Sequence, residues 1–274
     1  MSSVQAYVRQ IILRGKPARP PDPITTCRGV NWLPKNAALL LIGHGSSRYP
    51  GAGDLLHRHA DALRRAGHCA AVGLLNGSPS VADAVQALPA IAIRVVPFFM
   101  EDGYFTRVAI PRALGDRPVH LCPPVGIHPA ISGMIEHQAA AACASLGIAP
   151  GSAAVVLIGH GSASAPGRRL ALHDHATAVA ATRRFAQVET ACLEEAPFVA
   201  DILRRLRGYP VIAIGYFANL ASHVREDVPA LLDAEQAERG GGEPTVHFVG
   251  NVTENPAMVD IILDQAGFSD TGGE

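Results

Sequence analysis

The same eight-residue pattern occurs twice in this chain of 274 residues. Residues 39–46 read LLLIGHGS, and residues 155–162 read VVLIGHGS. In both places the apolar run is typical of a buried strand, and the flanking glycines predict a sharp turn that leaves the histidine uncovered. An internal repeat of this kind indicates that one structural unit is built twice.

The similarity between the two copies extends beyond this pattern. The histidine of each copy is followed by two more at offsets of 13 and 15: His44 by His57 and His59, and His160 by His173 and His175. GYFTRVAIP at 103–111 matches SHVREDVP at 222–229, and PVGIHPAIS at 124–132 matches FVGNVTENPAM at 248–258. The chain therefore contains two copies of a unit of about 115 residues, which meet near residues 147–152.

Strand and helix patterns alternate within each copy. Strands are expected at about 37–43, 70–75, 92–98 and 118–122, and again at about 153–159, 187–192, 210–216 and 245–249. Such alternation predicts an α/β fold with two tandem, similar lobes and a cleft between them. Each lobe should hold a parallel four-stranded sheet flanked by helices, with its ligand site at the carboxyl ends of the strands.

This pattern divides the chain into four parts. Residues 36–148 form an N-terminal lobe and residues 149–268 a C-terminal lobe, followed by a short tail at 269–274. Residues 1–35 read differently, with several basic side chains and PARPPDP at 17–23. No small-residue cleavage site follows the short apolar segment there, so an N-terminal extension is expected rather than a signal peptide.

The composition excludes several classes of protein. Hydrophobic residues make up 48% and charged residues 17%, which allows a large core, and the net charge of -1 gives no basic footprint for nucleic acid. No apolar run is long enough to span a membrane, so a soluble cytoplasmic protein is expected. The five cysteines form no CxxC pair and are expected to be buried free thiols: Cys27, Cys69, Cys122, Cys143 and Cys192.

In the second copy, polar residues follow three of the expected strands. His160 lies in the glycine turn, Glu194 and Glu195 follow the next strand in CLEEAP, and His223 opens a helix after the third. Parallel strands bring these positions to one edge of the sheet. Two imidazoles and one carboxylate suit first-row divalent metals and leave positions open for a substrate. Either glutamate fits the pattern.

The first copy lacks this set. Phe105 stands where the second copy has His223, and Asn76 and Gly77 stand where it has the two glutamates. His44 is therefore left without equivalent partners. A histidine in such a turn is commonly a hydrogen-bonded structural residue. The joint presence of all three groups in the second copy favours a metal site there.

Other readings of the polar residues are weaker. Histidines two positions apart on a helix do not share a face, so helix-surface roles are expected for His57, His59, His173 and His175. His128 begins a helix, where it is unremarkable. The chain has no phosphate-binding GxxxxGK[ST] or GxGxxG pattern and no GxSxG elbow, which argues against a nucleotide-binding protein or a serine hydrolase.

The two GHGS turns, CLEEAP, HVREDVP and the VGxxPxM-like helix start together resemble the CbiX-type class II chelatases. This family includes the sirohydrochlorin cobaltochelatases and ferrochelatases, and the resemblance covers about residues 37–266. It implies ATP-independent insertion of a divalent metal into an anionic tetrapyrrole. His160 and His223 would bind the metal and accept protons, and Glu194 would supply the carboxylate. Some long members are described with an N-terminal site, which does not carry over here because Phe105 replaces the histidine.

The resemblance also implies a substrate and a pathway. Cobalt insertion into sirohydrochlorin during cobalamin biosynthesis is favoured, since two-copy members are mostly described in that context. A His/Glu site accepts Fe2+ and Ni2+ equally well, so a ferrochelatase making sirohaem or a nickel chelatase stays open. A non-catalytic carrier of metal or tetrapyrrole is the alternative of another class.

Because the tetrapyrrole carries carboxylates, hydrogen-bond donors and basic side chains are expected around the metal site. The expected substrate-binding residues are Ser162, Arg225, His44 and Ser46. Further arginine candidates for the rim are Arg48, Arg107, Arg168 and Arg169. Neither a nucleotide cofactor nor a nucleic-acid or membrane partner is expected, and the protein should be a monomer or a homodimer.

Overall fold

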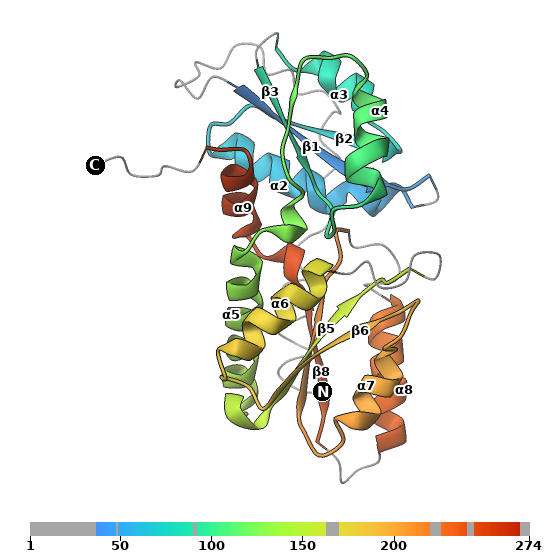
Figure 1. Cartoon of the computed structure of the whole chain (residues 1–274), viewed down its shortest axis with the longest axis vertical. Helices are drawn as coiled ribbons and strands as arrows, with labels where there is room; N and C mark the ends of the chain where they lie inside the picture. Colours follow the sequence, from blue (N-terminus) through green and yellow to red (C-terminus); the bar gives the residue numbers. More distant parts are fainter. Residues whose placement is uncertain are drawn as a thin grey trace, which may run out of the picture. The chain divides into compact units, whose positions relative to one another are not determined.

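The computed structural model describes residues 37–47, 49–89, 92–162, 170–219, 226–239 and 244–268. These residues form two compact units, and each unit is built on one four-stranded sheet (Figure 1). The expected N-terminal extension and C-terminal tail lie outside the described ranges.

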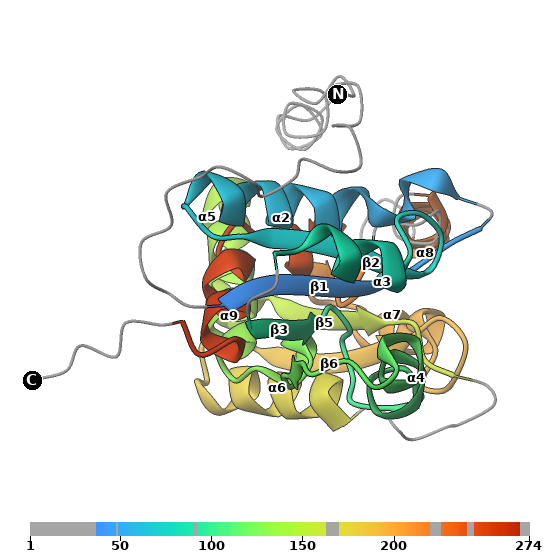
Figure 2. The ribbon, with the colours of Figure 1, turned by 90° about the horizontal axis from the view of Figure 1, so that it is seen from above.

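The first sheet has the strand order β2-β1-β3-β4, and all of its strands are parallel. Its strands are β1 (Ala37–Gly45), β2 (Ala70–Asn76), β3 (Ala92–Pro97) and β4 (His120–Leu121). The helices of this unit are α2 (Asp54–Arg65), α3 (Val81–Ala87), α4 (Ile110–Leu114) and α9 (Met258–Gln265). Viewed from above, β2, β1 and β3 run side by side, with α2 along them (Figure 2).

The second sheet repeats this arrangement with the order β6-β5-β7-β8, again all parallel. Its strands are β5 (Ala154–Gly159), β6 (Gln187–Cys192), β7 (Val211–Gly215) and β8 (Val246–Asn251). The helices of this unit are α5 (Ala130–Leu146), α6 (Leu170–Ala181), α7 (Val199–Arg205) and α8 (Val228–Arg239). The α/β prediction and its parallel four-stranded sheets are thus confirmed.

The strand order determines which helices share a face. The chain passes from the first to the second strand of each sheet in one direction and then moves in the opposite direction to the third and the fourth. Right-handed crossovers therefore place the helix after the first strand on one face and the helices after the second and third strands on the other. Accordingly α3 packs with α4, and α7 packs with α8 (Figure 1). The central strands are buried on both faces. Leu40 and Ile42 of β1, for example, are inaccessible to solvent and pack against α3 and α4.

The last helix of each sequence copy packs in the unit of the other copy. Helix α5, which ends the first copy, contacts α6, β7 and β8, whereas α9, which ends the second copy, contacts α2. Gln138 of α5 donates to the carbonyl of Val249 at 3.0 Å, and His128 Nε2 lies 2.6 Å from the carboxylate of Asp264 in α9. The compact units therefore differ from the linear ranges 36–148 and 149–268, because these two helices are exchanged.

The described cysteines are buried, as expected. They are Cys69, Cys122, Cys143 and Cys192. Burial raises the pKa of the Cys122 and Cys143 thiols, which keeps both neutral at physiological pH. No helix within the described ranges is long and apolar enough to cross a membrane.

Candidate metal centre

The second GHGS turn begins where β5 ends, at Gly159. Gly161 has a φ of +78°, and a Cβ atom there would lie 2.7 Å from Cγ of Glu195, so only glycine fits this position. The turn is joined to the segment after β6 by backbone hydrogen bonds. Leu193 donates to the carbonyl of Gly159 at 3.2 Å, and Glu194 donates to the carbonyl of His160 at 2.9 Å.

These backbone bonds bring two predicted site residues together. Nδ1 of His160 lies 3.5 Å from a carboxylate oxygen of Glu194, and the two side chains are 46% and 53% exposed. The same imidazole nitrogen lies 3.4 Å from the carbonyl of Gly161. An accessible imidazole beside an accessible carboxylate, at the carboxyl end of a parallel sheet, can bind a cation or accept a proton.

The next residue along the chain has the opposite environment. Glu195 is only 6% exposed, and its carboxylate accepts a hydrogen bond of 3.0 Å from the backbone amide of Ser162. The buried Glu195 side chain therefore stabilises the glycine turn through its hydrogen bond to Ser162, whereas Glu194 is exposed to solvent. The sequence alone left these two glutamates as alternatives. Their exposure distinguishes them, because a side chain that binds a substrate metal must be reachable from solvent.

In the N-terminal unit, the matching positions are all described. Nε2 of His44 lies 3.5 Å from the amide nitrogen of Asn76, and its ring packs edge-on against Phe105 with ring centroids 4.7 Å apart. The β1–β2 register pairs Gly45 with Asn76, and Phe105 opens the π-helical turn η2 (Phe105–Ala109) after β3. Three strand ends thus bring three side chains into contact in this unit.

The types of these three residues do not suit a metal. Phe105 has no ligand atom, and it stacks on Phe99 with ring centroids 5.6 Å apart. An amide is a weaker ligand than a carboxylate for a first-row metal. Nδ1 of His44 also lies 2.9 Å from the carbonyl of Gly45, and Ser46 accepts a bond of 3.2 Å from the amide of Tyr49.

Several predicted site residues lie outside the described ranges: His223, Arg225, Arg48, Arg168 and Arg169. Among the described residues, no group of three or more His, Cys, Asp or Glu side chains is placed to hold a metal ion. Of the three predicted metal ligands, His160 and Glu194 lie within the described ranges. The π-helical turn of the first unit recurs at Glu226 and Asp227, directly before α8 and three residues after His223.

The arginine candidate Arg107 is engaged within its own turn. Its guanidinium donates to the carboxylate of Asp102 at 2.7 Å and 3.1 Å, and the hydroxyl of Thr106 donates to the same carboxylate at 2.7 Å. The hydrogen bonds from Arg107, and then from Thr106, hold the pKa of Asp102 below its usual range. In the second copy Leu220 stands at the position of Asp102, so this ion pair is specific to the first copy.

The helix-surface role expected for the helical histidines is wrong for His59 and His175, because both side chains are buried between elements. His175 is buried beside Tyr216, and its Nδ1 lies 2.9 Å from the hydroxyl of Ser132 in α5. His59 is buried at the matching position in the other unit and packs near Phe98. His173 Nδ1 lies 3.3 Å from the Thr190 hydroxyl. These contacts join helices to strands or to one another.

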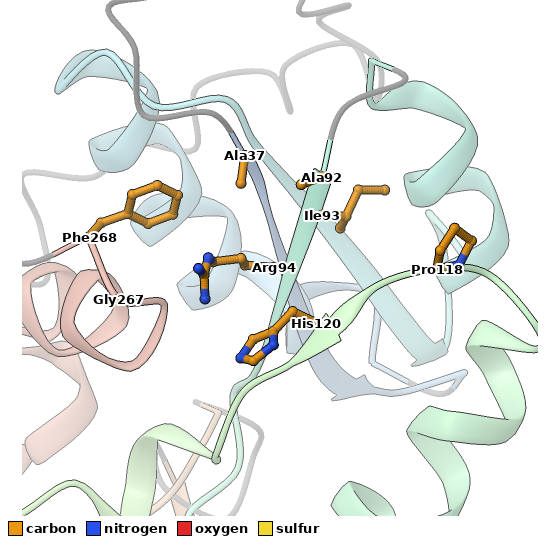
Figure 3. A pocket seen from close by; sticks show the side chains of 8 residues that line it. All are labelled: Ala37, Ala92, Ile93, Arg94, Pro118, His120, Gly267 and Phe268. Atoms are coloured by element: carbon orange, nitrogen blue, oxygen red, sulfur yellow. The ribbon is translucent and has the colours of Figure 1, made fainter.

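A small cavity of about 280 Å³ lies at the opposite edge of the N-terminal sheet (Figure 3). It is lined by Ala37, Ala92, Ile93, Arg94, Pro118, His120, Gly267 and Phe268. Ala37 and Ala92 are the first residues of β1 and β3, so the cavity is at the amino ends of these strands. It is remote from the glycine turns, where ligands of open parallel sheets bind.

Known proteins are similar to this chain in both sequence and fold. A probable sirohydrochlorin cobaltochelatase from Halobacterium salinarum is 25% identical over 264 residues, covering 84% of this chain and 90% of the relative. The multidomain chelatase-like protein DR2241 from Deinococcus radiodurans is 27% identical with a TM-score of 0.72. That match covers 87% of this chain but only 56% of DR2241.

A second solved structure is CbiX, described as the terminal enzyme for biosynthesis of sirohaem in denitrifying bacteria. It is 26% identical, with a TM-score of 0.63 over 83% of this chain and 97% of its own. The CbiX family model matches residues 38–142 and again 154–267. The two matches coincide with the two sequence copies and span most of the chain. This chain therefore belongs to the CbiX family.

Proposed function

We propose that this chain is a metal chelatase that inserts a divalent metal ion, with Co2+ as the favoured substrate, into sirohydrochlorin without ATP. The observation that carries this proposal is the exposed pair of His160 and Glu194 at the end of a parallel sheet. Family membership supports the reaction class, and the cobaltochelatase from Halobacterium salinarum supports cobalt. The sirohaem-forming CbiX keeps iron as the second candidate.

His223 is proposed as the second imidazole of the site. In the N-terminal unit, Phe105 occupies the matching position and contacts His44 directly. Asn76, which matches Glu194, lies on the same imidazole. The repeat relation therefore supports a site in which His160, Glu194 and His223 act together, as Phe105 and Asn76 pack with His44.

The reaction exchanges two pyrrole N–H protons of the macrocycle for one divalent ion. His160 and His223 are proposed to hold the ion on one face of the ring, with open coordination positions toward the pyrrole nitrogens. The protons pass to an imidazole or to the carboxylate of Glu194, which can act as general bases. Holding both reactants in one orientation supplies a large part of the rate.

The carboxylates of sirohydrochlorin are proposed to bind polar groups around this centre. The proposed substrate contacts are Ser162, Arg225, His44 and Ser46. Arg225 is the strongest charged candidate, since it lies two residues after His223 in the sequence. The proposed setting is cobalamin biosynthesis in the cytoplasm, by a monomer or a homodimer.

The direct test is anaerobic metallation of sirohydrochlorin. Co2+, Fe2+ or Ni2+ is added to protein and sirohydrochlorin, and the absorbance spectrum of the tetrapyrrole reports the rate of insertion. An enzyme turns over many macrocycles per chain and exceeds the protein-free rate, and the metal with the highest kcat/KM identifies the physiological substrate. Stoichiometric binding of metal or tetrapyrrole without any acceleration would contradict the proposal and favour the carrier.

A further inference from the structure

A buried carboxylate holds the turn that carries His160. Glu195 accepts the 3.0 Å hydrogen bond from the Ser162 amide, and its Cγ lies against the backbone of Gly161. Burying a carboxylate is unfavourable unless hydrogen bonds compensate for the lost water. A hydrophobic side chain would fill the same space without that penalty. The carboxylate therefore has a role other than packing, and its visible target is the backbone next to His160.

A second buried polar group holds the end of β7, from which the chain leads toward His223. The side-chain oxygen of Asn251 accepts from the Phe217 amide at 2.9 Å, and its nitrogen donates to the Phe217 carbonyl at 2.8 Å. Thr253 donates to the same carbonyl at 2.7 Å. Asn251 is 2% exposed and Thr253 is fully buried, so water does not compete for these bonds.

Both groups are specific to the C-terminal unit. The N-terminal unit has Gly77 at the position of Glu195. Pro124 and Gly126 match Asn251 and Thr253 by their places in the 3-10 turns that follow the last strand of each sheet. There the carbonyl of Phe99, which matches Phe217, accepts a 2.9 Å bond from the backbone amide of Gly126. The side-chain supports thus occur in the copy that has the candidate metal ligands and are missing from the copy that lacks them.

We propose that Glu195 and Asn251 are positioning residues for metal binding: Glu195 fixes the turn that carries His160, and Asn251 fixes the end of β7, the strand that pairs with β5. This inference rests on the proposed function of the same site. Groups that orient metal ligands commonly change metal affinity 10–100-fold when they are removed, because the ligands must then be ordered during binding. Glu194 is the reactive carboxylate of the pair, and Glu195 acts through the backbone.

The first test compares two substitutions of Glu195 that differ in whether they keep a carbonyl oxygen as a hydrogen-bond acceptor. Glu195→Gln keeps an oxygen that can accept the Ser162 amide bond, whereas Glu195→Met has similar length and no such acceptor. We expect Glu195→Met to weaken Co2+ binding roughly tenfold and to shift the Co2+ absorption bands, with Glu195→Gln within about threefold of wild type. Isothermal titration calorimetry gives the affinity, and thermal unfolding confirms that both variants are folded.

The second test uses matched positions in the two units. Asn251→Ala is expected to lower Co2+ affinity roughly tenfold, while Pro124→Ala at the equivalent position leaves it unchanged. Wild-type affinity in both Glu195→Met and Asn251→Ala, or an equal loss in Glu195→Gln and Glu195→Met, would overturn this inference. His160→Ala separates it from the proposed function. Undiminished Co2+ binding in that variant would overturn the metal site itself, and this inference with it.

Discussion

Neighbouring residues at the end of β6 have different environments and therefore different expected roles. Glu194 is exposed beside His160, and Glu195 is buried beneath the glycine turn. The sequence could not distinguish them, because an irregular turn has no periodicity to indicate which of two adjacent side chains is buried. Comparing the two copies gives a signal that was available in the sequence. Asn76, a polar residue, matches Glu194, and Gly77, which has no side chain, matches Glu195.

Glu194→Ala should remove activity without affecting stability. The side chain is 53% exposed and lies outside the buried core, so the free energy of unfolding should change by less than about 0.5 kcal/mol. The rate of metal insertion should fall roughly 10- to 100-fold, since the site loses a ligand and a proton acceptor. Steady-state metallation and urea unfolding check the two parts. Asn76→Ala, at the matching position, is the control, and an equal loss of activity there would contradict the assignment.

The half-buried His57 predicts an acid-sensitive contribution to stability. Burial, and then the charge of Arg64, lower the pKa of His57 from its ordinary value near 6.5. The unfolded chain therefore binds this proton at a higher pH than the folded chain. Stability is fully present above pH 6.5 and is lost as the pH falls toward the lowered value. His57→Gln should flatten this decline in urea unfolding between pH 7.5 and pH 5. Parallel curves for both proteins would contradict it.

At the scale of elements, the sequence predicts the strands well and the partners of the final helices poorly. All eight strands lie within a few residues of the expected ranges, because buried parallel strands give dense apolar runs. Helix α5 buries one stripe of apolar side chains, from Ile131 to Cys143, but its sequence does not identify the sheet that covers them. The exchange of α5 and α9 between the units was therefore not predicted.

The helix exchange predicts where a core substitution acts. Ile135 of α5 and Ile262 of α9 are both inaccessible to solvent, and replacing either with alanine should cost about 2–5 kcal/mol. Ile262→Ala should increase amide hydrogen exchange in β1–β3, and Ile135→Ala should increase it in β5–β8. Hydrogen exchange with mass spectrometry resolves the two regions. If each substitution instead increased amide hydrogen exchange in the sheet of its own sequence copy, the placement of α5 and α9 in the opposite units would be contradicted.

At the scale of the molecule, two similar units differ in the groups that a metal requires. In the N-terminal unit, Asn76 and Phe105 both contact His44, so three side chains from three strand ends already lie together there. These three residues do not form a metal-ligand set. The described part of the N-terminal unit also has no buried side chains equivalent to Glu195 and Asn251. This difference in residue types can be read from the sequence, because the repeat supplies a comparison for every position.

Restoring the missing groups should create a second site. In a His160→Ala background, which removes the native site, Asn76→Glu with Phe105→His should bind about one Co2+ per chain. The affinity should be lower than at the native site, because the supporting side chains are missing from this unit. Calorimetric stoichiometry measures the outcome. Failure to bind Co2+ would show that the matching positions do not converge as ligands.

We propose that metal insertion depends on the C-terminal unit. The rate of sirohydrochlorin metallation at saturating tetrapyrrole, measured in His160→Ala and in His44→Ala, tests this dependence. We expect His160→Ala to lower kcat by about 100-fold or more, beyond the effect of groups that only orient a ligand. We expect His44→Ala to raise KM for sirohydrochlorin and to leave kcat within about threefold of wild type. A wild-type kcat in His160→Ala, or a larger loss of kcat in His44→Ala, would contradict the account.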